Sequence, residues 1–287
     1  MLRRPGPPLV LTLVCAAALA VTGLLAKLVP FAEQGDVHTL QGFVGLQPHL
    51  WRIVHAVAHL ADPGPYALAG LGFALVALVR RRPRVAVAVL ALFLLTGLTT
   101  ESLKVLLASP RAEWFGANRI NAASWPSGHA TAAMTMALCA VMVAPPRLRP
   151  TVAAIGGGFA IAVGYAILTL AWHFPSDVFG GYLVAGMYVM LALSGLAALE
   201  RRWPSRTLRA PATRKVDLLP ALGIALGVAA VAVGVAIARG PALVGYAAEH
   251  TTFVVGAMAI ALLAVMLAAL LGLGFRGRAR DGRSLTN

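Results

Sequence analysis

Two histidines in a largely apolar chain stand in patterns that suit phosphate chemistry. His173 precedes Asp177 by four residues, and His129 ends the run Pro126-Ser127-Gly128-His129. A carboxylate at that spacing reaches Nδ1 of His173, fixes its tautomer and leaves Nε2 free to act as a nucleophile. His129 is placed to give a proton to a leaving oxygen. Alone, each motif also fits a simple helix start or an interfacial histidine.

The residues around His129 predict an anion site. Ser127 is a natural N-cap, and the first turn of a helix offers unpaired N–H groups and a partial positive charge to a phosphate. Gly128 lets the anion approach the backbone closely. Lys104 and Arg111 supply positive charge, the arginine with a planar fork suited to bidentate contact. The shared order of these groups favours one common site.

The composition predicts the elements that position them. Hydrophobic residues make up 59% of the 287 residues and charged residues only 12%, against about 25% charged in soluble domains. Charge-free runs of about 20 residues are long enough to cross a bilayer. We therefore predict an all-α, polytopic membrane bundle of about eight spans. Their ranges are 8–29, 64–79, 85–108, 127–144, 151–172, 178–198, 218–238 and 251–274.

The segments between the first two spans predict a loop and a surface helix. Residues 31–50, with Glu33 and Asp36, are expected to form a loop. Residues 51–61 are expected to form an interfacial helix whose histidines are solvated or pack against headgroups. Asp62 and Pro63 are expected to cap the second span, as Asp217 is expected to cap the seventh. Cys15 and Cys139 lie in apolar runs and are predicted to be buried packing residues.

The distribution of charge predicts the topology. The net charge of +14 does not indicate a nucleic-acid partner, because most lysines and arginines fall in alternate loops. Those at the N-terminus, at 80–84, 147–149 and 201–215, and in the tail place one side in the cytoplasm. Both termini are then cytoplasmic in the cell membrane. All the candidate residues lie at the outer ends of spans three to six, so we expect the rings of His129 and His173 to lie close together.

The three motifs resemble a known family. The pattern Lys104-x6-Arg111, the run Pro126 to His129 and His173-x3-Asp177 are similar to the signatures of the type 2 phosphatidic acid phosphatase superfamily. The resemblance covers about residues 8–200. It implies a metal-independent phosphohydrolase without a cofactor, which acts on a lipid phosphate in the bilayer. His173 would form a phosphohistidine, Asp177 would orient it and His129 would be the acid. Lys104, Arg111, Ser127 and Gly128 would hold the phosphoryl oxygens.

The sequence departs from the family pattern at two places. Ala112 follows Arg111 where the family has proline. Ala166 and Ile167 stand where the third motif carries Ser-Arg, so one phosphate-binding cation is missing. Loss of one preorganised donor costs roughly 10²–10³ in rate. Arg119, in the outer loop, is nominated as its substitute, and Glu101 as the membrane partner of Lys104.

Three functions are compatible with these motifs. The first is hydrolysis of a lipid phosphate or polyprenyl pyrophosphate at the outer face. The others are a weakened lipid-phosphate binding or transport protein and a phosphotransferase. Residues 1–200 are expected to form the six-span core, 201–216 a basic cytoplasmic linker, and 217–287 two further spans with a basic tail. The oligomeric state is not determined by the sequence.

Overall fold

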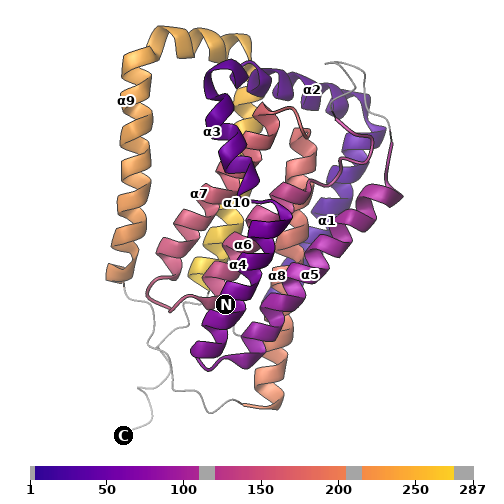
Figure 1. Cartoon of the computed structure of the whole chain (residues 1–287), viewed down its shortest axis with the longest axis vertical. Helices are drawn as coiled ribbons and strands as arrows, with labels where there is room; N and C mark the ends of the chain where they lie inside the picture. The colour runs from indigo at the N-terminus through magenta and orange to yellow at the C-terminus, as the bar shows by residue number, and fades with distance from the viewer. Residues whose placement is uncertain (1–3, 110–119, 205–214, 275–287) are drawn as a thin grey trace, which may run out of the picture.

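The computed structural model describes residues 4–109, 120–204 and 215–274. Figure 1 shows most of the helices packed as one elongated bundle. They are α1 (Gly6–Leu28), α2 (Pro30–Val44), α3 (Gln47–His59), α4 (Pro63–Val79), α5 (Pro83–Leu106), α6 (Gly128–Val143), α7 (Arg149–Thr169), α8 (Pro175–Arg202), η1 (Lys215–Leu218, a 3-10 turn), α9 (Leu219–Glu249) and α10 (Thr251–Gly274).

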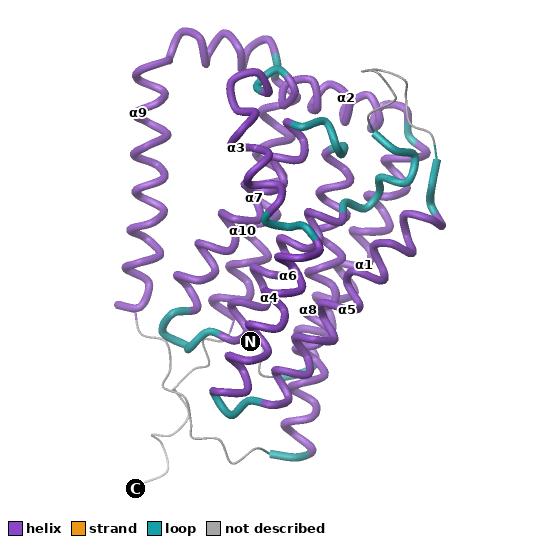
Figure 2. Tube along the Cα trace, viewed as in Figure 1, coloured by secondary structure: helices purple, strands orange, loops and turns teal. Residues whose placement is uncertain are grey.

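The predicted all-α membrane fold is confirmed. Each of the eight predicted spans falls on a helix, and no strand occurs in the described ranges (Figure 2). Five helices are long and apolar enough to cross a membrane by themselves: α1, α5, α7, α8 and α10. The end of α3 and α4 would together form a sixth span, bent by 49°, and α6 is apolar but shorter. A count of eight spans stays a prediction.

Helix α6 is the centre of the bundle. Every residue in it except Gly128, His129 and Ala140 is buried, as expected of a helix that is apolar on all sides. It packs against α4, α5, α7, α8 and α10. At its C-terminal end the Arg82 guanidinium donates to the Met142 carbonyl oxygen at 3.0 Å, which satisfies one of the free carbonyls of the last turn. Its N-terminal end carries Gly128 and His129.

Buried hydroxyl groups join α5 to α6 behind that N-terminal end. Thr100 Oγ1 donates to Thr131 Oγ1 at 3.2 Å, and Thr131 Oγ1 donates to the Ser127 carbonyl oxygen at 2.8 Å. Hydrogen bonds between small side chains are a usual means of holding helices together in a membrane. They fix the register of α5, which carries Lys104, against α6.

The prediction that residues 31–50 form a loop is wrong. Pro30 starts α2 at a position where its missing N–H costs nothing, and α3 follows almost directly. The glycines and charges of this stretch suggested a loop, but Val37, Leu40 and Phe43 are buried. Their spacing of three residues places them on one face of a helix. Burial of that face against the bundle outweighs the weak local helix propensity.

Two predicted caps also need correction. Asp62 stands at the N-cap position of α4, but its side chain makes no capping hydrogen bond. Asp217 lies within η1, and α9 begins only at Leu219 with Leu218 as its N-cap. The predicted N-cap Ser127 is confirmed, because its Oγ accepts from the Ala130 N–H at 3.3 Å. Cys15 and Cys139 are buried and unpaired, as predicted.

The two C-terminal helices differ in their packing. Helix α10 packs against α7 and α2, with the Tyr165 hydroxyl donating to the Ala257 carbonyl oxygen at 2.6 Å. Helix α9 contains Pro241 and bends, and its long arm stands beside the bundle (Figure 1). Proline inside a helix removes one backbone hydrogen bond and kinks it. The division into segments 1–200, 201–216 and 217–287 stays a prediction.

Candidate active site

The two histidines of the sequence patterns meet at the N-terminal end of α6. The ring centroids of His129 and His173 lie 6.4 Å apart. His129 comes from the first turn of α6, and His173 from the short segment between α7 and α8. Their side chains are 25% and 12% exposed, so both are reachable yet held by their surroundings.

Asp177 is held by the helix that it starts. Phe174 is the N-cap of α8, Pro175 occupies its first position, and Asp177 the third. The Asp177 carboxylate accepts from the Phe174 N–H at 2.9 Å, which is one half of a capping box. The same oxygen, Oδ2, faces His173 Nδ1 at 3.4 Å. This is a long hydrogen bond, and it leaves Nε2 of His173 turned away from the carboxylate.

A left-handed residue turns the chain from α7 toward His173. Ala171 has φ 55°, and the Trp172 N–H donates back to the Ile167 carbonyl oxygen at 2.9 Å. The Ala171 N–H donates to the Leu168 carbonyl oxygen at 2.9 Å. Together these bonds form a Schellman motif, which usually places glycine where Ala171 stands. The motif ends α7 and sends Trp172 and His173 across the end of the bundle.

Lys104 brings a cation to the start of α6. Its Nζ would lie 3.2 Å from a Cβ on Gly128, so a larger residue there would displace the ammonium by a few tenths of an ångström. Lys104 Nζ also pairs with Glu101 Oε1 at 2.6 Å, as nominated from the sequence. The same Glu101 oxygen would lie 3.6 Å from the Gly128 Cβ. A carboxylate therefore stands beside the ammonium and the helix N-terminus, where an anion is favoured.

Asp62 and His59 belong to this cluster although the motifs do not include them. Asp62 Oδ1 lies 3.0 Å from His129 Nε2, and Oδ2 lies 2.8 Å from His59 Nδ1. Desolvation raises the pKa of the Asp62 carboxyl, but the hydrogen bonds and charges of the two histidines lower it by more. The pKa therefore lies below its usual value. His59 is 56% exposed, in agreement with the expected solvation, and it also pairs with Asp62. The sequence signal was the spacing of His59 and Asp62 at one helical turn.

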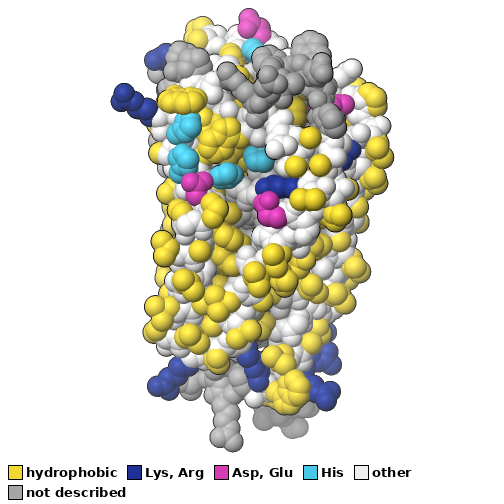
Figure 3. Space-filling view, turned by 45° about the vertical axis from the view of Figure 1, so that its right-hand side comes forward, with side chains coloured by type: hydrophobic (Ala, Val, Ile, Leu, Met, Phe, Trp, Pro, Cys, Tyr) yellow, Lys and Arg dark blue, Asp and Glu magenta, His cyan; other side chains and the backbone are white. Residues whose placement is uncertain are grey.

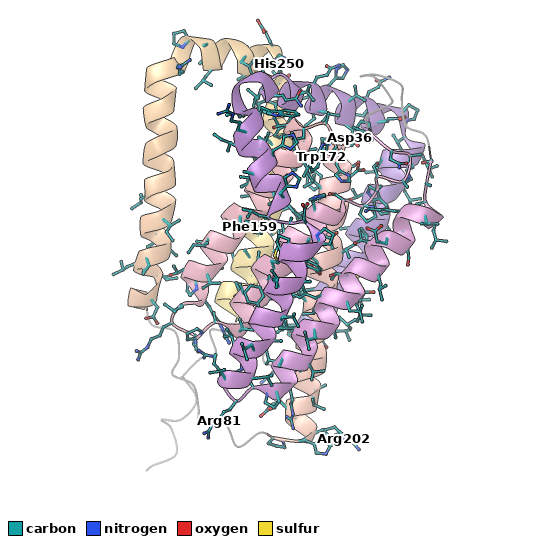
Figure 4. The ribbon with its side chains drawn as sticks, viewed as in Figure 1. Asp36, Arg81, Phe159, Trp172, Arg202 and His250 are labelled. Atoms are coloured by element: carbon teal, nitrogen blue, oxygen red, sulfur yellow. The ribbon has the colours of Figure 1, made fainter. Side chains whose placement is uncertain are left out.

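Asp36, which was predicted to lie in a loop, contacts the first turn of α8. Its Oδ1 accepts from the Ser176 N–H at 3.0 Å, and its Oδ2 accepts a short hydrogen bond from the Ser176 hydroxyl. Asp36 lies on α2 and Ser176 in the first turn of α8. This contact ties α2 to the helix that carries Asp177, at the end of the bundle where Trp172 also lies (Figure 4).

Three further positions that were singled out in the sequence are Arg111, Arg119 and Ile167. Arg111 and Arg119 lie outside the described residues. Ile167, which stands in place of the family's third cation, is fully buried, and its neighbour Ala166 is also buried. This position is an apolar packing site on α7. In the described part of the chain, no group of three or more His, Cys, Asp or Glu side chains could hold a metal ion; a metal-independent reaction stays a prediction.

The cluster occupies one face near one end of the molecule. Figure 3 shows histidines, acidic side chains and a basic side chain gathered there above a broad belt of hydrophobic side chains. Further basic side chains lie at the upper left edge and at the opposite end, where Figure 4 places Arg81 and Arg202. The orientation of these two ends in the membrane stays a prediction.

Comparison with known proteins bears on this cluster. Residues 84–201 match the model of the PAP2 superfamily. The match covers less than half of the chain and lies within the helical bundle. The matched range contains every motif residue named above, from Lys104 to Asp177. The resemblance to the type 2 phosphatidic acid phosphatase superfamily is confirmed.

One solved structure is similar to this chain. It is the crystal structure of "the first transmembrane PAP2 type phosphatidylglycerolphosphate phosphatase from Bacillus subtilis". The TM-score is 0.48 and the sequence identity 20%, over 69% of this chain and 99% of that chain. No curated protein matches the chain. Asp36, His59 and Asp62 precede the matched PAP2 range, although they contact residues within it.

Proposed function

We propose that this PAP2 protein is an integral membrane phosphatase that removes phosphate from a lipid phosphate or a polyprenyl pyrophosphate. The observation that carries the proposal is the 6.4 Å separation of the His129 and His173 rings beside the start of α6. Two imidazoles at this separation can contact the same phosphoryl group. The Lys104 ammonium and the α6 N-terminus supply the charge that the group requires.

The anion site combines three kinds of donor. The first turn of α6 offers backbone N–H groups, and the Lys104 ammonium lies beside it, 3.2 Å from the position that a Cβ on Gly128 would take. Lys104 contributes a point charge. Arg111 and, as a substitute for the missing third cation, Arg119 are proposed to complete the set from the loop before α6. Phosphoryl transfer depends mostly on such positioning and charge stabilisation.

The reaction proceeds in two steps through a phosphohistidine. In the first, Nε2 of His173 attacks the phosphorus, the bond from phosphorus to the lipid oxygen breaks, and His129 protonates that oxygen. In the second, water attacks the phosphohistidine, His129 accepts a proton from the water, and the phosphorus–nitrogen bond breaks. Asp177 orients His173 through Nδ1 in both steps. If an alcohol replaced water, the same intermediate would make the protein a phosphotransferase.

The depth of the site suits a lipid substrate. Helix α6 has 16 residues, a length of roughly 24 Å, against a hydrocarbon core of about 30 Å. If its Arg82 end lies at one headgroup level, its histidine end stops about 6 Å short of the other, a depth at which a lipid can keep its tail in the bilayer. We place that end at the outer face of the cell membrane, with both termini in the cytoplasm, because the basic loops lie at the other end.

A substrate panel tests the proposal. Purified protein in detergent is assayed for phosphate release from phosphatidate, phosphatidylglycerophosphate and undecaprenyl pyrophosphate, with and without a chelator. We expect release from at least one of them, unaffected by the chelator and lost in His173→Ala. Labelled substrate should leave phosphate on the wild-type protein as an acid-labile, alkali-stable adduct. Equal release from wild type and His173→Ala would contradict the proposal.

A lipid-phosphate binding or transport protein is the second candidate. It is favoured by one observation: Ile167 is fully buried where the family's third cation is expected. Such a protein would bind lipid phosphate without turnover. Binding of a phosphatidate-containing nanodisc with no phosphate release from any member of the panel would favour this candidate over the phosphatase.

A further inference from the structure

Asp62 binds His129 by a contact that lies outside the PAP2 motifs. The residue lies between α3 and α4, before the PAP2 range, and is 67 positions from His129 in the chain. Its Oδ1 is 3.0 Å from His129 Nε2, and its Oδ2 is 2.8 Å from His59 Nδ1. One carboxylate therefore bridges a half-buried imidazole at the site and an exposed imidazole on α3.

The local sequence explains why Asp62 does not cap its own helix. An N-cap side chain normally accepts from the N–H of the second or third helical residue. Helix α4 begins Pro63-Gly64-Pro65, and proline at the third position has no N–H to donate. Gly64 is the one remaining partner of this kind. The carboxylate is thus available to histidines on neighbouring helices.

The contact gives the site two carboxylate–imidazole pairs. Asp177 faces His173 through Nδ1 at 3.4 Å, and Asp62 faces His129 through Nε2 at 3.0 Å. A carboxylate in this position fixes the tautomer of a histidine and stabilises its imidazolium form. Because Nε2 of His129 is engaged by Asp62, Nδ1 is the nitrogen that remains to give a proton to a substrate oxygen.

Neighbouring groups make this support important for His129. Two neighbours disfavour a positive charge on the His129 ring: the Lys104 ammonium on α5 and the His173 imidazole before α8. The negative charge of Asp62 favours it. Trp172 packs its ring 5.4 Å from the His129 ring and 6.0 Å from the His59 ring. Contact with the indole holds both imidazoles in position around the carboxylate.

We propose that Asp62 is the positioning residue of His129: it orients the ring and stabilises the protonated imidazole that acts as the acid toward the leaving oxygen. His59 holds the second carboxylate oxygen and so restricts the rotation of Asp62. The inference rests on the proposed function, since it assigns a role within that reaction. No new bond-making step is added; the proton that reaches the leaving oxygen still comes from His129.

The role predicts a dependence on the leaving group. A lipid alkoxide is a poor leaving group and needs the proton, whereas a nitrophenolate leaves with little need of it. Asp62→Asn keeps the shape and an acceptor oxygen but removes the charge. We expect its kcat/KM for a lipid phosphate, which reports formation of the phosphohistidine and not its hydrolysis, to fall at least about tenfold. Its kcat/KM for 4-nitrophenyl phosphate should stay within about twofold of wild type.

Matched variants separate this role from a structural one. Glu200→Gln removes another ion-paired carboxylate, 3.1 Å from Arg84 at the far end of the bundle, and should leave both activities unchanged. His59→Gln keeps a donor to Asp62 and should reduce the lipid kcat/KM less than Asp62→Asn. An equal fall on both esters in Asp62→Asn, or no fall on either, overturns the inference. Absence of turnover by wild type on any ester would instead overturn the proposed function.

A folding control keeps the result interpretable. The thermal midpoint of Asp62→Asn in detergent is measured beside that of Asp62→Ala, which also removes the acceptor. If Asp62 only pinned α4 to α6, both variants would lose stability and both esters would be affected alike. We expect Asp62→Asn to keep the wild-type midpoint and to change the ratio of lipid to nitrophenyl turnover, and a lowered midpoint with an unchanged ratio would overturn the inference.

Discussion

The Ser127 N–H donates to the carbonyl oxygen of Asp177 at 2.9 Å. This bond joins the turn that starts α6 to the first turn of α8, and so connects the His129 motif directly to the His173 motif. The two helices approach closely at this point because Gly180 and Gly181 have no side chain. An ideal Cβ on Gly181 would lie 2.7 Å from the Ser127 carbonyl oxygen.

Gly181→Ala should therefore damage both stability and activity. The added methyl meets backbone atoms that cannot move without shifting the Ser127 turn, and overpacking of this kind costs about 1–3 kcal/mol. We expect a lower thermal midpoint and a fall in phosphate release. Gly195→Ala on the same helix is the control, since a Cβ there meets nothing within 4 Å. A wild-type midpoint for Gly181→Ala would contradict the close approach.

Asp177→Asn should lower kcat with a small effect on KM. The residue is fully buried and its carboxylate accepts from both Phe174 and His173. An asparagine can present its NH₂ group to the histidine and select the wrong tautomer, as is known for carboxylate–histidine pairs. We expect a loss of about 10²–10⁴ in kcat. Steady-state kinetics on the best lipid substrate measure it, and a change confined to KM would argue against an orienting role.

Glu101→Gln should tighten the binding of phosphate substrates. The Glu101 carboxylate stands beside Lys104 and the α6 N-terminus, where the phosphate is proposed to bind. It is 67% exposed, and exposed ion pairs contribute only about 0–1 kcal/mol. We therefore expect KM and the inhibition constant for inorganic phosphate to fall by up to about fivefold. If Glu101 instead holds Lys104 in place, both constants rise.

Ala171 tests how the segment before His173 is held. A non-glycine residue in the left-handed region destabilises the folded chain by roughly 1–2 kcal/mol. Ala171→Gly removes this strain, but the greater freedom of glycine in the unfolded chain offsets part of the gain. We expect its thermal midpoint to equal or exceed that of wild type with activity retained. Ala171→Val should lower both, because β-branched residues are poorly tolerated there. Arg81 has the same φ of 55° after α4, so Arg81→Gly should show the stability effect without any change in activity.

Local patterns in the sequence determined the membrane helices and the motif residues. Long apolar runs must form helices in a bilayer because each backbone group needs an internal partner, and Ser127 caps α6 through atoms only three residues away. The signatures also marked His129, His173 and Asp177 as candidates. Charge placed in alternate loops separated the basic end from the histidine end. All of these depend on neighbours within a few positions.

Tertiary packing decided the rest. Residues 30–44 are helical because their apolar face is buried. Asp36 accepts a hydrogen bond from Ser176 because that helix crosses the end of the bundle. Asp62 looked like a helix cap, yet it turns to His129, 67 positions away. Local spacing cannot specify such a contact. Which side chains share a site depends on how α3, α4 and α6 pack together, and only the folded chain brings the second carboxylate to the second histidine.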